Sequence, residues 1–440
     1  MMTPKQIRTD FCRYVSLNVL GMVGLSCYIL ADTFFISRAL GARGLAALNL
    51  AISIYSILHA TGLMFGIGGA TRYTILKARQ EETEADRTFT QTVISGLMAG
   101  GIFLAVGLFL TEPLSRLLGA DDDTLGMTVT YLKTILCFSP CFILNNILLA
   151  FIRNDKNPRL SMAAMLIGSF SNIVLDYVFI FPFSMGMFGA AFATCLAPVI
   201  SIGVLSLHLI RRQNSFHLAL CPFCLRRLGN IISLGISSFI TEVSSGIVLI
   251  VFNLVILGLT GNTGLAAYGI VANVALVAAA VFTGIAQGIQ PLASLGCGSN
   301  DRKLLSLLRR YTLALSLALA AVIYGTILAF SGSIIAVFNS EGSQELAAIA
   351  ENGFRLYFAG FFFAGINITM AALLSASDHP GAAFAISITR GCVAILPFVL
   401  LLAPLSGMNG VWLSFVAAEL TACVITGTAL FYLHFFPFLL

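Results

Sequence analysis

Charged residues are scarce in this chain: Asp, Glu, Lys and Arg together make up 10% of its 440 residues. A soluble domain carries about 25%, so the scarcity excludes an ordinary soluble protein. Tryptophan is nearly absent, with one residue against 35 phenylalanines, so any aromatic belt at a membrane interface has to use phenylalanine and tyrosine. Most of the ten cysteines lie inside apolar runs, where they act as small apolar side chains and give no disulfide framework.

The sequence also lacks the residue constellations of common enzymes. No Walker A sequence occurs, so nothing indicates ATP-driven chemistry. His59 is the only histidine deep in an apolar run, and it has no serine or aspartate partner at a fixed spacing, which argues against an intramembrane hydrolase. His217, Cys221 and Cys224 offer three ligands where a structural zinc site needs four. We therefore expect two inert cytosolic thiols, no metal site, no resident cofactor and no enzyme activity.

Twelve apolar runs of membrane-spanning length fill the sequence instead. A bilayer core needs about 20 apolar residues in a helix. The runs are approximately 14–36, 48–70, 92–111, 130–151, 160–182, 189–210, 232–258, 266–292, 312–331, 354–375, 382–404 and 410–433. The predicted fold is an all-α integral membrane protein with twelve transmembrane helices.

Basic residues concentrate on one side of these runs. Of the 24 Lys and Arg residues, 18 lie in the N-terminus or in connections on its side: Lys5, Arg8, Arg13, Arg72, Lys77, Arg79, Arg87, Arg153, Lys156, Arg159, Arg211, Arg212, Arg226, Arg227, Arg302, Lys303, Arg309 and Arg310. Five lie on the other side, namely Arg38, Arg43, Arg116, Lys133 and Arg355, and Arg390 lies inside a run. The positive-inside rule predicts a multi-pass protein of the plasma (inner) membrane with both termini cytoplasmic.

The two halves of the sequence repeat at an offset of 220 to 222 residues. The matches are Gly44–Ala47 with Gly264–Ala267, Asn145 with Asn367, Pro158 with Pro380, and Gly186–Gly189 with Gly407–Gly410. The nearly equal offsets predict two pseudo-symmetric six-helix bundles. We expect an N-lobe at 1–210 with helices 1–6, a cytoplasmic linker at 211–230 and a C-lobe at 231–440 with helices 7–12. Two such bundles around a central cleft are typical of alternating-access transporters.

Ionisable side chains inside the runs are the candidates for function, because a charge at the bilayer centre costs at least about 2.5–3.5 kcal/mol. Asp32 lies near the end of the first run, and Tyr28 lies one turn earlier on the same helix face. Asp176 lies in the fifth run, with Asn172 one turn earlier. Thr194, at the start of the sixth run, is placed to join them. The alternative for each acid is a structural hydrogen bond or snorkelling near a helix end.

Two further acids lie inside runs of the second half. Glu242 lies in the seventh run and is a second candidate for ion coupling. Arg390 and Glu419 each lie about ten residues into consecutive antiparallel runs, so they reach a similar depth. We expect this pair to form a structural ion pair.

Three stretches resemble a known family. They are DTFFISRALGARGLAALNLA from Asp32, the N-x-x-x-D at Asn172 and Asp176, and GIAQGIQPLASLGCGSND at 284–301. Over essentially its full length the chain resembles multidrug and toxic compound extrusion (MATE) transporters, in the MepA-like/DinF-like branch.

The resemblance implies secondary active efflux of organic cations and drugs, driven by entry of protons or sodium. It places an ion-coupling and substrate-binding cluster at Tyr28, Asp32, Asn172, Asp176 and Thr194, and a seventh-helix acid at Glu242. Gln290 and Asn367 are further candidates. Two features depart from the family: the tenth run has no acid, and Gly21 and Gly24 stand where some members bend the first helix at a proline.

We therefore expect an antiporter that alternates access between its two lobes. Its partners are expected to be a small cationic amphiphilic substrate and membrane lipid, with no nucleic acid and no second copy of the chain. The alternative is a flippase or exporter of a lipid-linked or metabolite substrate from the same superfamily. A flippase cavity needs several basic residues for pyrophosphate, whereas the runs hold Arg390 and little else basic. Acids dominate, which favours cations.

Overall fold

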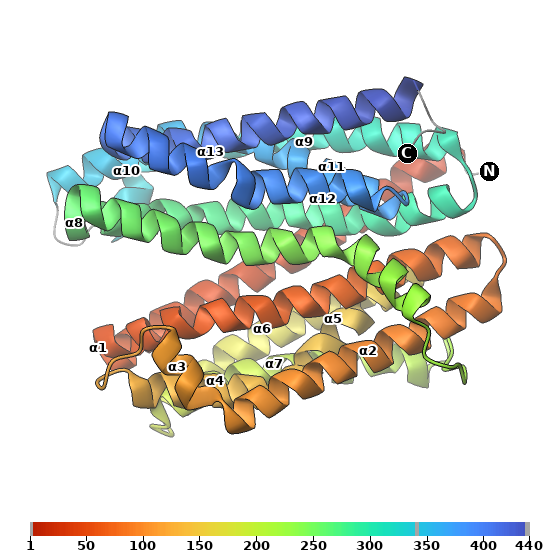
Figure 1. Ribbon diagram of the computed structural model, residues 1–440, viewed down its shortest axis with the longest axis horizontal. Coiled ribbons are helices and arrows are strands. Elements are labelled where there is room, and N and C mark those ends of the chain that lie inside the picture. Colours follow the sequence, from red (N-terminus) through yellow and green to blue (C-terminus); the bar gives the residue numbers. More distant parts are fainter. Residues whose placement is uncertain (1–2, 339–342, 436–440) are drawn as a thin grey trace. The chain divides into compact units, whose positions relative to one another are not determined.

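The computed structural model describes residues 3–338 and 343–435, and it holds no strand within these ranges (Figure 1). The ends of the predicted lobes, 1–2 and 436–440, lie outside the described residues. The helices are α1 Pro4–Ala78, α2 Glu82–Phe109, α3 Thr111–Leu117, α4 Leu125–Cys137, α5 Ser139–Asn154, α6 Pro158–Ile180, α7 Gly186–Ile210, α8 Leu225–Gly298, α9 Arg302–Phe338, α10 Gln344–Tyr357, α11 Phe361–Ala376, α12 Pro380–Ile388 and α13 Ile395–Phe435. A 3₁₀ turn, η1 Phe358–Gly360, joins α10 to α11, and a π turn, η2 Thr389–Val393, follows α12. The all-α prediction is confirmed.

Three of these helices each contain a sharp break at a glycine. Gly41 in α1, Gly261 in α8 and Gly407 in α13 have φ values of 63°, 62° and 58°. This left-handed conformation suits glycine, which has no Cβ to clash. Each of the three broken helices counts as two spans, and the bent pair α4 and α5 counts as one. With α10 and α11 taken as one span, α12 joined to the first part of α13, and the seven-residue α3 left out, the described helices give the twelve spans that the sequence predicts.

The fourth predicted run, 130–151, is not a straight helix. The structure bends it by 50° between α4 and α5. Pro140 is the second residue of α5, and proline has no N–H to continue the hydrogen bonds of the preceding helix. The Ser139 hydroxyl donates to the Gly100 carbonyl of α2 at 2.9 Å, which ties the bend to a neighbouring helix.

The sequence repeat is also visible in the backbone. Positive φ values recur at equivalent positions of the two halves: Gly41 and Gly261, Gln80 and Asn300, and Lys156 and Asp378. Each pair is separated by 220 or 222 residues, the offset of the sequence matches. The turns that join the spans are therefore repeated along with the spans, as two pseudo-symmetric bundles require.

The chain groups into two compact units whose limits lie inside helices. One unit comprises residues 16–243 and 294–301, and the other comprises 3–15, 244–293 and the described residues from 302 onward. The predicted division placed the change at a linker, 211–230. In the structure α8 begins at Leu225, so the last residues of that linker are helical, and the unit of residues 16–243 includes the first turns of α8.

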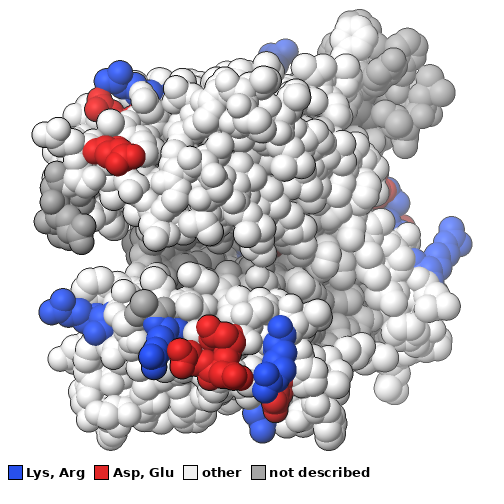
Figure 2. Space-filling view, turned by 60° about the vertical axis from the view of Figure 1, so that its left-hand side comes forward, with Lys and Arg blue, Asp and Glu red and all other residues white. Residues whose placement is uncertain are grey.

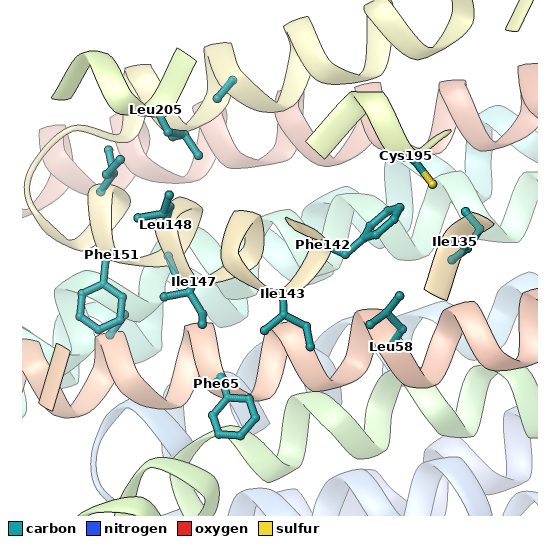
Figure 3. Close-up of a cluster of buried hydrophobic side chains, with 14 of the residues drawn as sticks. Leu58, Phe65, Ile135, Phe142, Ile143, Ile147, Leu148, Phe151, Cys195 and Leu205 are labelled. Atoms are coloured by element: carbon teal, nitrogen blue, oxygen red, sulfur yellow. The ribbon is translucent and has the colours of Figure 1, made fainter. Parts of the chain in front are cut away.

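The core of the first unit is built from closely packed helices (Figure 3). Leu58 of α1 and Ile143 and Ile147 of α5 are fully buried there. Gly66 lets α1 approach α5 closely, since a Cβ at this position would lie 2.6 Å from the Asn146 carbonyl oxygen. In a membrane such packing relies on small residues and close contact, because lipid is as apolar as the core.

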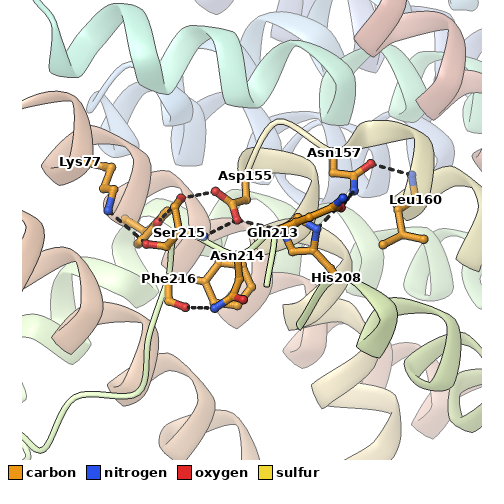
Figure 4. Close-up of polar contacts among 10 residues, drawn as sticks. Lys77, Asp155, Asn157, Leu160, His208, Gln213, Asn214, Ser215 and Phe216 are labelled. Carbon is orange, nitrogen blue, oxygen red and sulfur yellow. Dashed lines mark hydrogen bonds and ion pairs between the residues drawn. The ribbon is translucent and has the colours of Figure 1, made fainter. Parts of the chain in front are cut away.

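Residues 211–224, the linker strap, lie against the first unit without helical structure (Figure 4). The Asp155 carboxylate accepts hydrogen bonds from His208 Nε2 at 2.9 Å and from the Ser215 backbone N–H at 2.8 Å. Lys77 donates to the Ser215 carbonyl at 3.1 Å. Phe216 is 1% exposed, with its ring centroid 4.5 Å from that of Phe89. The strap is therefore bound to the unit that precedes it in sequence.

The outer surface carries few charges. In Figure 2 the charged side chains form small groups separated by wide uncharged areas. Exposed residues such as Phe34, Phe109, Phe170 and Leu254 are large and apolar. Exposed apolar surface of this extent suits contact with lipid chains.

Candidate functional site

Two buried carboxyl groups form the centre of the site. Asp32 on α1 is 7% exposed and Asp176 on α6 is 0% exposed, and both belong to the unit of residues 16–243. They lie close enough to interact electrostatically. Among the described residues, the Oδ1 atom of each has no hydrogen-bond partner. Buried polar atoms are nearly always satisfied, so two orphan oxygens on neighbouring acids indicate a place for a proton or a cation.

Asn172 holds Asp176 in place. In the amide orientation that satisfies both of its polar groups, Asn172 donates to Asp176 Oδ2 at 3.1 Å and accepts from the Thr194 backbone N–H at 3.3 Å. The Thr194 hydroxyl donates to the Ala190 carbonyl of its own helix at 3.1 Å. Thr194 therefore lies in the cluster, as the sequence suggests, and its backbone N–H makes the link to Asn172.

Three tyrosines surround the acids, of which the sequence indicated Tyr28 alone. The Tyr28 hydroxyl lies 3.1 Å from that of Tyr55. Tyr131 on α4 is 4% exposed and interacts electrostatically with Asp32 and Asp176. Tyr55 and Tyr131 lie inside predicted spans, which is a weak signal by itself. Whether these tyrosines belong to the acid cluster depends on which helices lie next to each other. The spacing of residues along one helix does not reveal those neighbours.

Glu242 joins the same unit as the two aspartates. It is half-buried on α8 and acts electrostatically on Tyr55, as Asp32 does. The predicted C-lobe contains Glu242 in sequence, but the compact unit of residues 16–243 includes it. The structure thus brings the seventh-helix acid to the tyrosines of the first cluster.

Gln290 and Asn367 belong to the other compact unit. Gln290 is 2% exposed on α8. Asn367 on α11 donates to the backbone and to the carboxylate of Glu419, both at 2.8 Å, and accepts from the Thr426 hydroxyl at 2.9 Å. Asn367 therefore serves a polar network in its own unit.

Arg390 and Glu419 form the charged part of that network. Arg390 Nη2 lies 2.6 Å from Glu419 Oε1, and Arg390 Nε lies 3.1 Å from the same oxygen. The side chains are 13% and 2% exposed. Arg390 lies in the π turn η2, which shifts the side-chain register of the helix by one residue. Both Glu419 oxygens accept hydrogen bonds, in contrast to the two aspartates.

The first cluster can hold positive charge. Three acids, Asp32, Asp176 and Glu242, lie with three tyrosines, whose rings attract cations through their negative faces. Two carboxyl groups at short range do not both keep a negative charge without a proton or a cation. A proton and a cation bound at this cluster would therefore compete for the same negative charge.

A protein-family comparison covers most of the chain. The MatE family model matches residues 19–178 and 236–401, more than half of the sequence. The chain is 26% identical over 408 residues to the multidrug export protein MepA of Staphylococcus saprophyticus, covering 92% of this chain and 89% of the relative. MepA of Staphylococcus aureus is 24% identical, with the same coverage.

Solved structures support the same fold. An outward-facing structure of a multidrug resistance MATE family transporter of the MOP superfamily matches with a TM-score of 0.90 at 20% identity, covering 96% of this chain and 95% of that one. A MOP superfamily transporter from Pyrococcus furiosus also matches with a TM-score of 0.90 at 20% identity, covering 97% of each chain. The family match, the twelve spans and the buried acid cluster agree, and the chain belongs to the MATE family of membrane transporters.

Proposed function

We propose that this protein exports organic cations across the plasma (inner) membrane in exchange for entering protons, by alternating access between its two lobes. The observation that carries the proposal is the pair of neighbouring buried acids, Asp32 and Asp176, each with an unpartnered Oδ1. The names of the MepA relatives, multidrug export proteins, support export of several small molecules.

The exchange follows from shared charge. When the acids carry a proton, the site has less negative charge and binds a cation poorly. When the proton leaves toward the cytoplasm, the negative charge is restored and a cation enters against the tyrosine rings. Tyr28 and Tyr55 provide hydroxyl groups beside the acids. These hydroxyls can hydrogen-bond the acids both when they are protonated and when they are charged. Because one chain holds the whole cluster, a monomer is sufficient for transport.

Transport of ethidium in proteoliposomes tests the proposal, with proton and sodium gradients imposed separately. We expect uptake against the proton gradient by the wild type and none by Asp32→Asn. Because Asp32 Oδ1 has no hydrogen bond to lose, Asp32→Asn should unfold at or above the wild-type temperature. Asp123→Asn is the control, since its carboxylate is 70% exposed, and it should transport normally.

Two outcomes would change the proposal. Wild-type rates in Asp32→Asn would remove the coupling role of that acid. Transport that follows the sodium gradient alone would replace the proton by sodium and leave the rest of the mechanism in place.

A further inference from the structure

His59 is a titratable group beside the acid cluster that the proposed exchange does not use. It lies on α1, one turn after Tyr55, and is half-buried. The two rings are stacked, with centroids 6.0 Å apart and planes 14° from parallel. Tyr55 also meets Phe142 of α5 edge-on, at 5.7 Å and 83°. The Tyr55 hydroxyl lies 3.1 Å from that of Tyr28, which is one turn before Asp32. Tyr28, Tyr55 and Phe142 thus form an aromatic wall that extends from His59 to the acid cluster.

The side-chain amide of Asn146 lies next to the imidazole and directs its hydrogen-bond donors toward it. Asn146 Nδ2 lies 3.5 Å from His59 Nδ1 and donates to the Phe142 carbonyl at 3.1 Å. Gly62 packs against Asn146, since a Cβ at Gly62 would lie 2.8 Å from Nδ2. The amide is therefore held with its NH₂ group toward the ring, where it would donate to Nδ1 of a neutral imidazole whose proton is on Nε2.

A second proton on His59 does not fit this arrangement. It would place an N–H of the ring against the NH₂ of Asn146, so the amide would have to turn and release the Phe142 carbonyl. A neutral ring fits the NH₂ group of Asn146, and a charged ring would rearrange Asn146 as well as add a positive charge.

The charged and titratable groups that act on this wall come from several helices. They are Asp32 and Tyr28 of α1, Tyr131 of α4, Cys195 of α7 and Glu242 of α8, with Asp176 of α6 next to Asp32. Asp32, Asp176 and Glu242 are acids, so a neutral His59 adds no positive charge beside them. A charged imidazole would offset one of these acids at the aromatic surface.

We propose that His59 is a second proton-binding group of the site, and that its charged form expels cations from the wall of Tyr28, Tyr55 and Phe142. The proposal rests on the proposed function for its substrate class. Imidazole is the side chain that ordinarily changes charge between about pH 5 and 8. His59 thereby adds a step of proton-driven release to that of the aspartates.

Ethidium binding to the full-length protein in detergent tests this inference, because the charge of ethidium is constant over this range. A charged imidazole repels the ethidium cation through a medium of low dielectric constant, so the wild type should lose about tenfold or more in affinity from about pH 8 to pH 5. His59→Phe keeps an aromatic ring at this position, and His59→Gln keeps a polar side chain. In both variants the affinity for ethidium should fall much less between about pH 8 and pH 5 than in the wild type. His217→Gln, on the exposed strap, should keep the wild-type slope.

The outcomes separate this inference from the proposed function. A wild-type slope in both His59 variants, together with a flat response in Asp32→Asn, overturns the role of His59 and leaves the exchange in place. Absence of ethidium binding at any pH overturns the substrate class, and nitrogen NMR of the labelled protein then decides for His59, since the chain has five histidines. A His59 signal that titrates in this range and moves in Asn146→Ala supports the proton site, and one that stays neutral at pH 5 overturns it.

Discussion

Buried ionisable residues of this protein differ in whether the protein satisfies them. Glu419 receives hydrogen bonds from Arg390 and Asn367 on both carboxylate oxygens, whereas Asp32 and Asp176 each keep an orphan Oδ1. A fully paired carboxylate contributes to structure, because moving its partner leaves a bare charge in a low-dielectric region. An acid with an unpartnered oxygen can take up a ligand at no loss of protein contacts.

The Arg390–Glu419 pair should be strongly coupled in stability. Removing either partner alone, as in Arg390→Met or Glu419→Gln, should destabilise the fold by about 3–5 kcal/mol, because one charge stays buried without its partner. The double variant should cost about as much as a single one. Unfolding in detergent measures the cycle, and simple addition of the two effects would exclude an energetic pair.

Glycines determine how closely the long helices approach one another. A Cβ on Gly68 of α1 would lie 2.0 Å from the Ile231 carbonyl oxygen of α8, and one on Gly235 would lie 2.0 Å from that of Met64. The backbones of α1 and α8 therefore touch at this crossing. A Cβ on Gly24 would lie 2.4 Å from the Cδ2 atom of the Leu166 side chain of α6.

Gly21 and Gly24 have a packing role in this structure. Before the break at Gly41, α1 keeps helical backbone angles throughout, so neither residue bends it. Their lack of a side chain brings α1 against Met165 and Leu166 of α6, the helix that carries Asp176. They help to hold the two aspartates at short range.

Substitution at the α1–α8 crossing should therefore be costly. Gly68→Ala should lower stability by about 1–3 kcal/mol, the usual effect of overpacking, because backbone atoms of α8 have to move. Gly101→Ala is the matched control: its Cβ would meet nothing within 4 Å, and removing a helix glycine should leave stability equal or slightly higher. Thermal unfolding compares the two, and an equal response in both would contradict the close crossing.

The linker strap should detach when its central acid is removed. Asp155 and His208 are 7% and 1% exposed, and Asp155 also binds the backbone and hydroxyl of Ser215. Asp155→Ala should cost about 1–3 kcal/mol, because it leaves His208 and the Ser215 N–H without their partner. It should also speed trypsin cleavage after Arg211 and Arg212, which are exposed but lie at the start of a strap that is held in place. Inverted vesicles give access to this face. Cleavage no faster than in the wild type or in Asp122→Ala, an exposed-acid control, would show that other contacts hold the strap.

For the whole molecule, the basic residues predict the orientation in the membrane. With 18 Lys and Arg on one side and five on the other, the strap should face the cytoplasm. Cys224 is a suitable reporter, because the backbone N–H of Arg227 lowers the pKa of its thiol and thiolates react fastest.

A variant that keeps Cys224 as its single cysteine should react with an impermeant maleimide in inverted vesicles and resist it in intact cells. Because the pKa of Cys224 is lowered, its labelling rate should decrease less than that of an ordinary thiol as the pH falls below neutral. Rapid labelling in intact cells that remain sealed would reverse the orientation.

The sequence by itself determined the twelve spans and the repeat. A membrane span is a local property, since about 20 apolar residues cross a bilayer wherever they occur. The turns at Gly41 and Gly261 are also local, because their backbone conformation suits glycine. Asp32, Asp176 and Glu242 could be singled out for a similar reason, since an acid in an apolar run is costly in any fold.

Only the tertiary structure decided which of these side chains meet. Helix periodicity pairs Tyr28 with Asp32 and Asn172 with Asp176, but it does not say that Tyr55 and Tyr131 lie beside them or that Asn146 faces His59. It also does not separate Glu419, whose oxygens are both satisfied, from Asp32, whose Oδ1 is not. These distinctions depend on contacts between helices far apart in sequence, which are set by the packing of whole surfaces and by glycines such as Gly24 and Gly68.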